Sequence, residues 1–73
     1  MITLAERGTI VLSKQEEKIL KLIAKGYNND EVANILYVST HTIKAHLKSI
    51  YIKLDVNNRT SAVYKALKSE LID

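Results

Sequence analysis

The sequence predicts an all-α fold, a bundle of four helices with a short N-terminal arm. The 73 residues include no proline and only two glycines, which leaves few tight turns for a multi-stranded sheet. Four segments carry apolar residues at helical spacing instead. The chain has no cysteine, so disulfides and Cys-based zinc sites are excluded from its single small core. We expect residues 1–12 to form the arm, with Leu4, Ile10, Val11 and Leu12 as its apolar residues, and residues 13–73 to form the domain.

The first helix is predicted over residues 14–25. Ser13 followed by Glu16 is a capping box, in which each side chain bonds the backbone N–H of the other residue. Gly26 stands where a left-handed residue often ends a helix. The apolar residues at helical spacing between these signals are Ile19, Leu20, Leu22 and Ile23.

The second helix is predicted over residues 29–36. Asn28 and Glu31 repeat the capping box, and acids in the first turn favour the positive end of the helix dipole. Tyr37 and Val38 then make a brief connection. The stripe expected to be buried consists of Val32, Ala33, Ile35 and Leu36.

The third helix is predicted over residues 40–54, with Ser39 as its N-cap. Its apolar seam is Ile43, Leu47, Ile50 and Leu54, which fall within a narrow arc at about 100° per residue. The opposite arc holds His41, Ala45, Lys48 and Ile52, with Lys44 and Ser49 at its edges. No acid occurs from Ser39 to Leu54, so one face of this helix is small, polar and basic.

The fourth helix is predicted over residues 59–69, after a turn at residues 55–57 and with Asn58 as its N-cap. Ala62 and Ala66 lie on one side of it, with Val63 beside them. The other side carries Tyr64, Leu67 and Leu71. Apolar residues on both sides are more than a helix on the surface of a small bundle needs.

Charge is distributed unevenly along the chain. Residues 1–38 contain five basic and five acidic residues, whereas residues 39–68 contain six basic residues and Asp55 as the single acid. A neutral first half and a basic second half are typical of a protein that binds a polyanion through one face. A solvated lysine-rich surface is the alternative, and charge alone does not decide between the two.

Two short helices joined by about three residues predict a helix-turn-helix unit, whose second helix lies in the major groove of DNA. Lys44 and Lys48 are four residues apart on that helix, a spacing at which like charges are mildly unfavourable. An anion opposite them would explain the pair. Lysine bonds guanine O6 and N7, and the methyl group of Ala45 suits a thymine methyl.

Several short motifs lie in a common order between Leu12 and Leu67. They are Leu12-Ser13, Glu16, Ile19-Leu20, Ile23–Gly26, Asn29–Ala33, Ser39, Thr42–His46, Ile50, Lys53-Leu54 and Asn58–Ala62. Together they resemble the LuxR/GerE-type helix-turn-helix domain. The resemblance implies a sequence-specific, dimeric regulator of transcription that binds double-stranded DNA. Ser13, Gln15 and Asp55 depart from the Thr, Arg and Gly common in the family, and Asp55 adds an acid near Lys53.

The resemblance also implies site residues and partners. The expected base contacts are Lys44, Ala45 and Lys48. The expected phosphate contacts, or their supports, are Asn29, Thr40, Thr42, His46 and Lys53. The expected dimer contacts on the last helix are Val63, Tyr64, Leu67 and Leu71. The partners are DNA, a second copy, and RNA polymerase or other regulators, and the chain is either the output domain of a longer regulator or a small stand-alone one.

Other functional classes find little support in the sequence. His41 and His46 lie about 140° apart around their helix, so we expect no metal site. No nucleophile–base pair or Gly-rich phosphate loop is present, so we expect no enzyme and no cofactor. No apolar run approaches the length of a membrane span and no secretion signal is visible, so we expect a cytoplasmic protein. A small helical protein-interaction module is the alternative to DNA binding.

Overall fold

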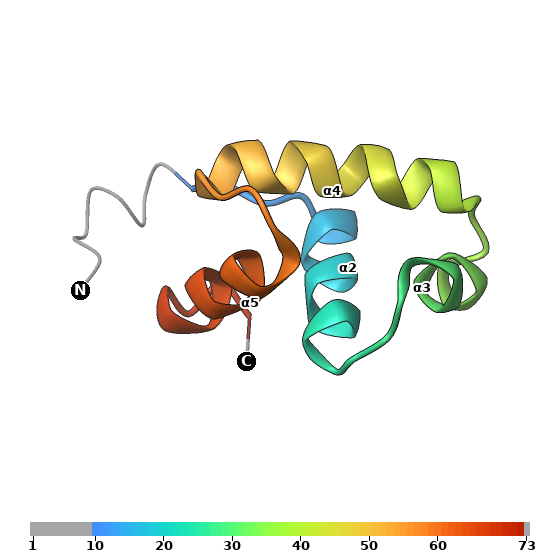
Figure 1. Cartoon of the computed structure of the whole chain (residues 1–73), viewed down its shortest axis with the longest axis horizontal. Coiled ribbons are helices and arrows are strands. Elements are labelled where there is room, and N and C mark those ends of the chain that lie inside the picture. Colours follow the sequence, from blue (N-terminus) through green and yellow to red (C-terminus); the bar gives the residue numbers. More distant parts are fainter. Residues whose placement is uncertain (1–9, 73) are drawn as a thin grey trace.

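The structure is a computed structural model that describes residues 10–72, and within them helices are the regular secondary structure and no strand occurs. The helices are α2 (Lys14–Ala24), α3 (Asn29–Leu36), α4 (Thr40–Leu54) and α5 (Arg59–Lys68). The long α4 runs along one side of the molecule. Beneath it, α3 lies at the end where α4 begins, α2 near its middle, and α5 at the end where it finishes (Figure 1). The predicted all-α fold is confirmed.

The helices begin where the capping signals predict. In the first box, Ser13 N donates to Glu16 Oε1 at 2.8 Å and Glu16 N donates to Ser13 Oγ at 3.1 Å. The second box closes in the same way between Asn28 and Glu31, at 2.8 and 2.9 Å. The far ends differ by one residue, because Lys25 and Ser69 are C-caps rather than the last residues of their helices.

Two helices end on residues in the left-handed conformation. Asp55 closes α4 at a φ of 57°, and Tyr37 closes α3 at a φ of 58°. A left-handed residue turns the chain so that later N–H groups bond the last free carbonyls of the helix. Asp adopts this conformation at modest cost, whereas Tyr has no local hydrogen bond to offset the clash of its Cβ. No residue near Tyr37 in the sequence predicts this left-handed turn.

The core lies between α4 and the three helices beneath it. The four residues of the α4 seam are all buried, as predicted. The buried apolar residues of the core are Ile19, Leu20, Ile23, Val32, Ala33, Ile43, Leu47, Ile50, Leu54, Ala62, Ala66 and Ile72. Of the expected arm, Ile10 and Leu12 pack partly against this core, while Leu4 lies outside the described residues.

One core prediction is wrong. Ile35 was expected in the buried stripe of α3, but it is 42% exposed. At about 100° per residue, Ile35 lies roughly 100° from the middle of the arc formed by Val32, Ala33 and Leu36. Among the described helices, α3 packs chiefly on α2 and α4, and the side of α3 where Ile35 lies stays uncovered.

Candidate nucleic-acid interface

The two helices of the predicted helix-turn-helix unit are joined by a tight turn at residues 37–39. Val38 N donates to Ala33 O at 3.0 Å, which folds the chain back on the end of α3. Thr40 Oγ1 donates to Asp30 Oδ1 at 2.7 Å. This bond joins the first turn of α4 to the first turn of α3, so the N-terminal ends of both helices are held together.

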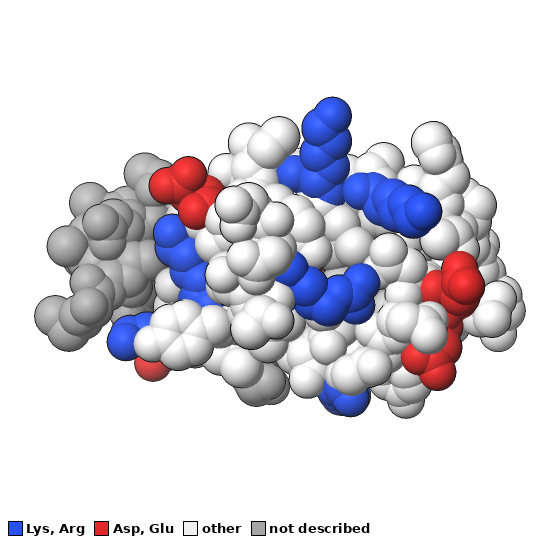
Figure 2. Space-filling view, viewed as in Figure 1, with Lys and Arg blue, Asp and Glu red and all other residues white. Residues whose placement is uncertain are grey.

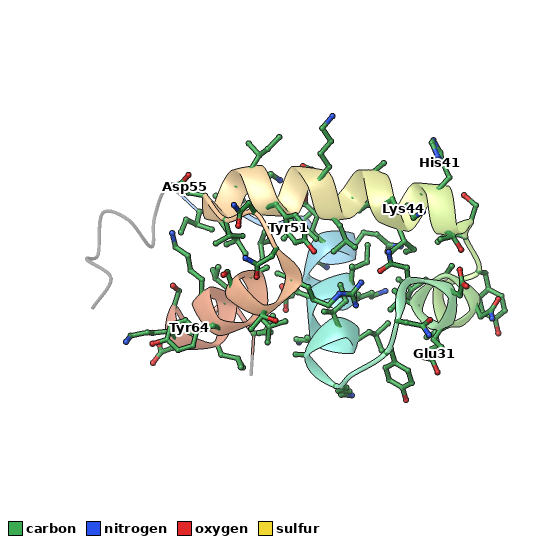
Figure 3. All side chains as sticks on the ribbon, viewed as in Figure 1. Glu31, His41, Lys44, Tyr51, Asp55 and Tyr64 are labelled. Carbon is green, nitrogen blue, oxygen red and sulfur yellow. The ribbon has the colours of Figure 1, made fainter. Side chains whose placement is uncertain are left out.

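The outer face of α4 is exposed and free of acids. Its exposed residues are His41, Lys44, Ala45, Lys48 and Ile52. His41 extends away from the bundle, and Lys44 lies further along the same helix (Figure 3). Figure 2 shows basic side chains standing out along α4, while acidic side chains gather near α3 and near the far end of α4. All three predicted base-contact residues are therefore accessible on one helix.

The start of α4 offers hydrogen-bond donors, but its hydroxyl groups are partly engaged. Thr42 N donates to Ser39 Oγ at 3.1 Å, and the two hydroxyl oxygens lie 3.0 Å apart. Each hydroxyl has one hydrogen, so whichever of the two donates, the other keeps a hydrogen for a phosphate. The hydroxyl hydrogen of Thr40 goes to Asp30. Thr40 can still offer its backbone N–H, because the first turn of a helix has no internal acceptors.

Asn29, the first residue of α3, is linked to the first residue of α5. Arg59 Nη2 donates to Asn29 Oδ1, and Arg59 Nη1 donates to Tyr27 O at 3.1 Å. The side-chain oxygen of Asn29 is therefore engaged, while its Nδ2 group keeps its donors. This role of Arg59 could not be predicted from the sequence, because its partners lie 30 and 32 residues away and no local pattern indicates them.

Lys53 forms an ion pair with Glu16 of the same chain. Its Nζ is 2.7 Å from Oε1 of Glu16, a buried residue that also accepts a hydrogen bond from Ser49 Oγ at 3.0 Å. Burial by itself raises the pKa of the Glu16 carboxyl. The hydrogen bonds that the carboxylate accepts, that of Lys53 foremost, outweigh burial and hold this pKa below its ordinary value. Sequence analysis saw Glu16 only as a capping residue and missed its link to α4.

The expected dimer residues on α5 divide into two pairs. Tyr64 and Leu67 are 63% and 46% exposed, respectively. Val63 and Leu71 are half-buried and pack partly against the core of their own chain. His46, the remaining expected phosphate contact, is half-buried on α4. The apolar surface that α5 presents to solvent therefore centres on Tyr64 and Leu67.

Neither a cluster of potential metal ligands nor a helix able to span a membrane occurs in the described part of the chain. Over residues 10–72, no three His, Cys, Asp or Glu side chains gather in a way that would hold a metal ion. None of the helices within these residues has the length and apolar character needed to span a membrane.

Two helices joined by a tight turn, the second with an exposed basic face, define a helix-turn-helix DNA-binding domain. Residues 10–66 match the family described as bacterial regulatory proteins of the luxR family. The chain belongs to this family, and the resemblance noted in the sequence is confirmed. The family is one of DNA-binding transcription regulators and is not a class of enzymes.

Related proteins agree with this assignment. The chain is 48% identical over 63 residues to the oxygen regulatory protein NreC of Staphylococcus haemolyticus, covering 86% of this chain and 29% of NreC. It is 44% identical over 62 residues to the response regulator protein VraR of Staphylococcus aureus strain Mu3, covering 85% of this chain and 30% of VraR. The chain thus spans less than a third of the length of these relatives.

Two solved structures share the fold. The response regulator ChrA of a heme-sensing two-component system matches with a TM-score of 0.83 and 42% identity, over 85% of this chain and 31% of ChrA. The transcription factor GerE matches with a TM-score of 0.81 and 24% identity, over 85% of this chain and 92% of GerE. At that identity the GerE match supports the fold alone.

Proposed function

We propose that the chain binds double-stranded DNA sequence-specifically as a dimer and regulates transcription, with α4 in the major groove. The exposed, acid-free face of α4 carries this proposal. A helix that enters the groove needs such a face, since an acid there would repel the phosphates on both sides. The apolar seam on the opposite side of α4 fixes it to the bundle while this face stays free.

Base reading is assigned to Lys44, Ala45 and Lys48. The two lysines bring mobile ammonium donors that suit guanine O6 and N7, and the Ala45 methyl suits a thymine methyl. All three lie in the N-terminal two-thirds of α4, the part of a recognition helix that contacts base edges.

Phosphate binding is assigned to the N-terminal ends of α3 and α4, together with His46 further along α4. The donors are the amide of Asn29, the backbone N–H of Thr40, the Ser39–Thr42 hydroxyl pair and the imidazole of His46. Lys53 has a different role in this proposal. Its ammonium group is bonded to the buried Glu16 carboxylate, so we assign it the role of a support that holds α4 on α2.

The dimer contact is assigned to α5 through Tyr64 and Leu67, with Val63 and Leu71 beside them. Two copies related by a two-fold axis would read half-sites about one helical turn apart. We extend the proposal to the setting of the chain: it acts in the cytoplasm, has no catalytic activity of its own, and takes RNA polymerase or other regulators as partners.

Selection of bound sites from a pool of random duplexes tests the proposal as a whole. We expect enrichment of two related half-sites. The affinity should fall steeply as salt rises, because phosphate contacts release counterions. A chain that shifts no duplex at low salt would belong to the alternative class, a small helical protein-interaction module.

Lys48→Ala tests the assignment of base contacts. We expect it to weaken binding to the selected site by about 1–3 kcal/mol and to relax preference at one base position, as measured by fluorescence anisotropy on a set of single-base variants. Lys18→Ala is the matched control, since Lys18 is an exposed lysine on α2 and lies opposite the buried stripe of that helix. An equal loss on selected and random duplexes would make Lys48 a phosphate contact instead.

A further inference from the structure

We propose that Arg59 is a positioning residue for DNA binding, which holds the amide of Asn29 so that its Nδ2 group faces a phosphate. This inference rests on the proposed function, in which Asn29 is a phosphate contact. It adds a residue from α5 to an interface otherwise built from α3 and α4. Neither the charge pattern nor any local motif of the sequence indicates this role.

The guanidinium of Arg59 is held at two points. One nitrogen donates to the carbonyl of Tyr27, just before α3, and the other donates to the side-chain oxygen of Asn29. The guanidinium is planar and its donors form a rigid fork. Two acceptors on neighbouring parts of the chain therefore hold the guanidinium in one orientation. The guanidinium in turn holds the side-chain oxygen of Asn29 in place.

The chemistry of the two groups then selects one orientation of the amide. An Asn side chain carries an acceptor on one side and two donors on the other, whereas guanidinium carries donors only. Flipping the amide would place its NH₂ group against the donors of Arg59, so Oδ1 faces Arg59 and Nδ2 faces away. A phosphate oxygen accepts hydrogen bonds and does not donate them, so this orientation is the one that binds DNA.

The location of the amide also fits. Thr40 is bonded to Asp30, which follows Asn29 in the first turn of α3. The N-terminal ends of α3 and α4 therefore lie together, and the Asn29 donor belongs to the same end of the unit as the free N–H groups of α4. Asn29 is half-exposed, so its side chain is accessible to a strand of DNA.

A simpler role for Arg59 is to join α5 to the start of α3. Both roles predict some loss of thermal stability when Arg59 is replaced. They differ in how the loss of DNA affinity depends on Asn29. A positioning residue acts through the amide and has no effect once the amide is gone, whereas a structural link or a direct phosphate contact acts without it.

The experiment is a double-mutant cycle in the full 73-residue chain, with Arg59→Met, Asn29→Ala and the double variant. Affinity for the selected duplex and its salt dependence are measured by fluorescence anisotropy, with melting temperatures alongside. We expect Arg59→Met to weaken binding about 3–10-fold. This loss corresponds to the free-energy cost of ordering one polar side chain on binding. In the Asn29→Ala background, Arg59→Met should cause no further loss.

Asn29→Asp is the second variant, and it keeps the test decisive where Arg59→Met unfolds the chain. The carboxylate still accepts from Arg59, so the fold is retained, but the donor to the phosphate is replaced by a negative charge. We expect at least a tenfold loss of affinity with the melting temperature held or raised. Unchanged binding by Asn29→Asp would overturn the inference.

Four other results also count against the inference. If the loss from Arg59→Met persists without Asn29 and the slope of log affinity against log salt falls by about 1, Arg59 contacts a phosphate itself. If the melting temperature falls while affinity at a permissive temperature holds, Arg59 is a structural link only. If the wild type binds no duplex, the proposed function fails together with this inference, whereas equal binding by all variants removes this inference alone.

Discussion

Glu16 combines a local and a long-range role at the level of a single residue. Its carboxylate caps α2 through the backbone N–H of Ser13, and it also accepts hydrogen bonds from Ser49 and Lys53 on α4. A buried carboxylate without donors is strongly unfavourable. The three donors remove that penalty and make Glu16 the polar link between the first helix and the helix proposed to read DNA.

Lys53→Met tests this link through its pH dependence. The pKa of Glu16 is lowered in the folded wild type, so its contribution is present above the unfolded pKa and is lost as pH falls through the folded pKa. Without Lys53, burial is opposed by fewer donors and the folded pKa rises. We expect a loss of about 1–2 kcal/mol at pH 7, a modest figure because the Lys53 side chain is 39% exposed.

The measurement is urea unfolding from pH 7 down to pH 3. The difference between wild type and Lys53→Met should shrink on the acid side, where Glu16 becomes neutral in both proteins. Lys48→Met is the matched control, because Lys48 is an exposed lysine on the same helix. A difference that stays constant with pH would show that the variant acts through packing rather than through the Glu16 charge.

At the level of elements, α5 has two apolar sides, one buried in the core and one exposed. Ala62 and Ala66 are buried in the core, while Tyr64 and Leu67 remain exposed. Small residues on the inner side let the helix lie close to α2 and α4. Large apolar residues on the outer side do not stabilise a single copy, which is why we propose them as the contact with a second one.

Leu67→Asp tests this contact. We expect the chain to remain helical by circular dichroism, because Leu67 is outside the core, but to lose cooperative binding to paired half-sites. The charge would have to be buried in the dimer, which is costly when it has no partner. Thr60→Asp, at another exposed position of α5, is the control. Sedimentation that shows unchanged dimer formation would refute the assignment.

The start of each helix could be predicted from the sequence because a cap is a local feature. Ser13, Asn28, Ser39 and Asn58 each bond an N–H group three residues further on. The burial of Ile35 could not be predicted, because it depends on which neighbours α3 acquires in the bundle. The links of Glu16 to α4 and of Arg59 to α3 join residues about thirty or more positions apart, and only the folded chain brings them together.

At the level of the whole molecule, the small core limits stability. A domain of this size rarely gains more than about 3–5 kcal/mol from its core, so ligand binding is a large addition. At a free duplex concentration of about 100 times Kd, specific binding adds about 2.7 kcal/mol. For a domain of this length we therefore expect the melting temperature to rise by roughly 10–20 °C.

Thermal unfolding followed by circular dichroism measures this rise. The control is a duplex of the same length with both half-sites scrambled, at the same concentration and salt. We expect the scrambled duplex to give a much smaller rise, which disappears as salt increases. An equal rise with both duplexes would mean that the chain recognises the phosphate backbone and no particular bases.

The number of proposed base contacts on α4 limits how many base pairs one copy of the chain can recognise. Three side chains, Lys44, Ala45 and Lys48, face outward where bases would lie, enough for roughly four base pairs at most. A DNA sequence of that length recurs by chance on the order of once in a few hundred base pairs. Among the ~10⁶ or more competing positions of a genome, this is far too often for specific binding. Two copies that bind two such half-sites lower the chance occurrence of the combined site to about once in tens of thousands of base pairs. A recognition helix with so few base contacts can specify a unique binding site only when two copies each bind a half-site.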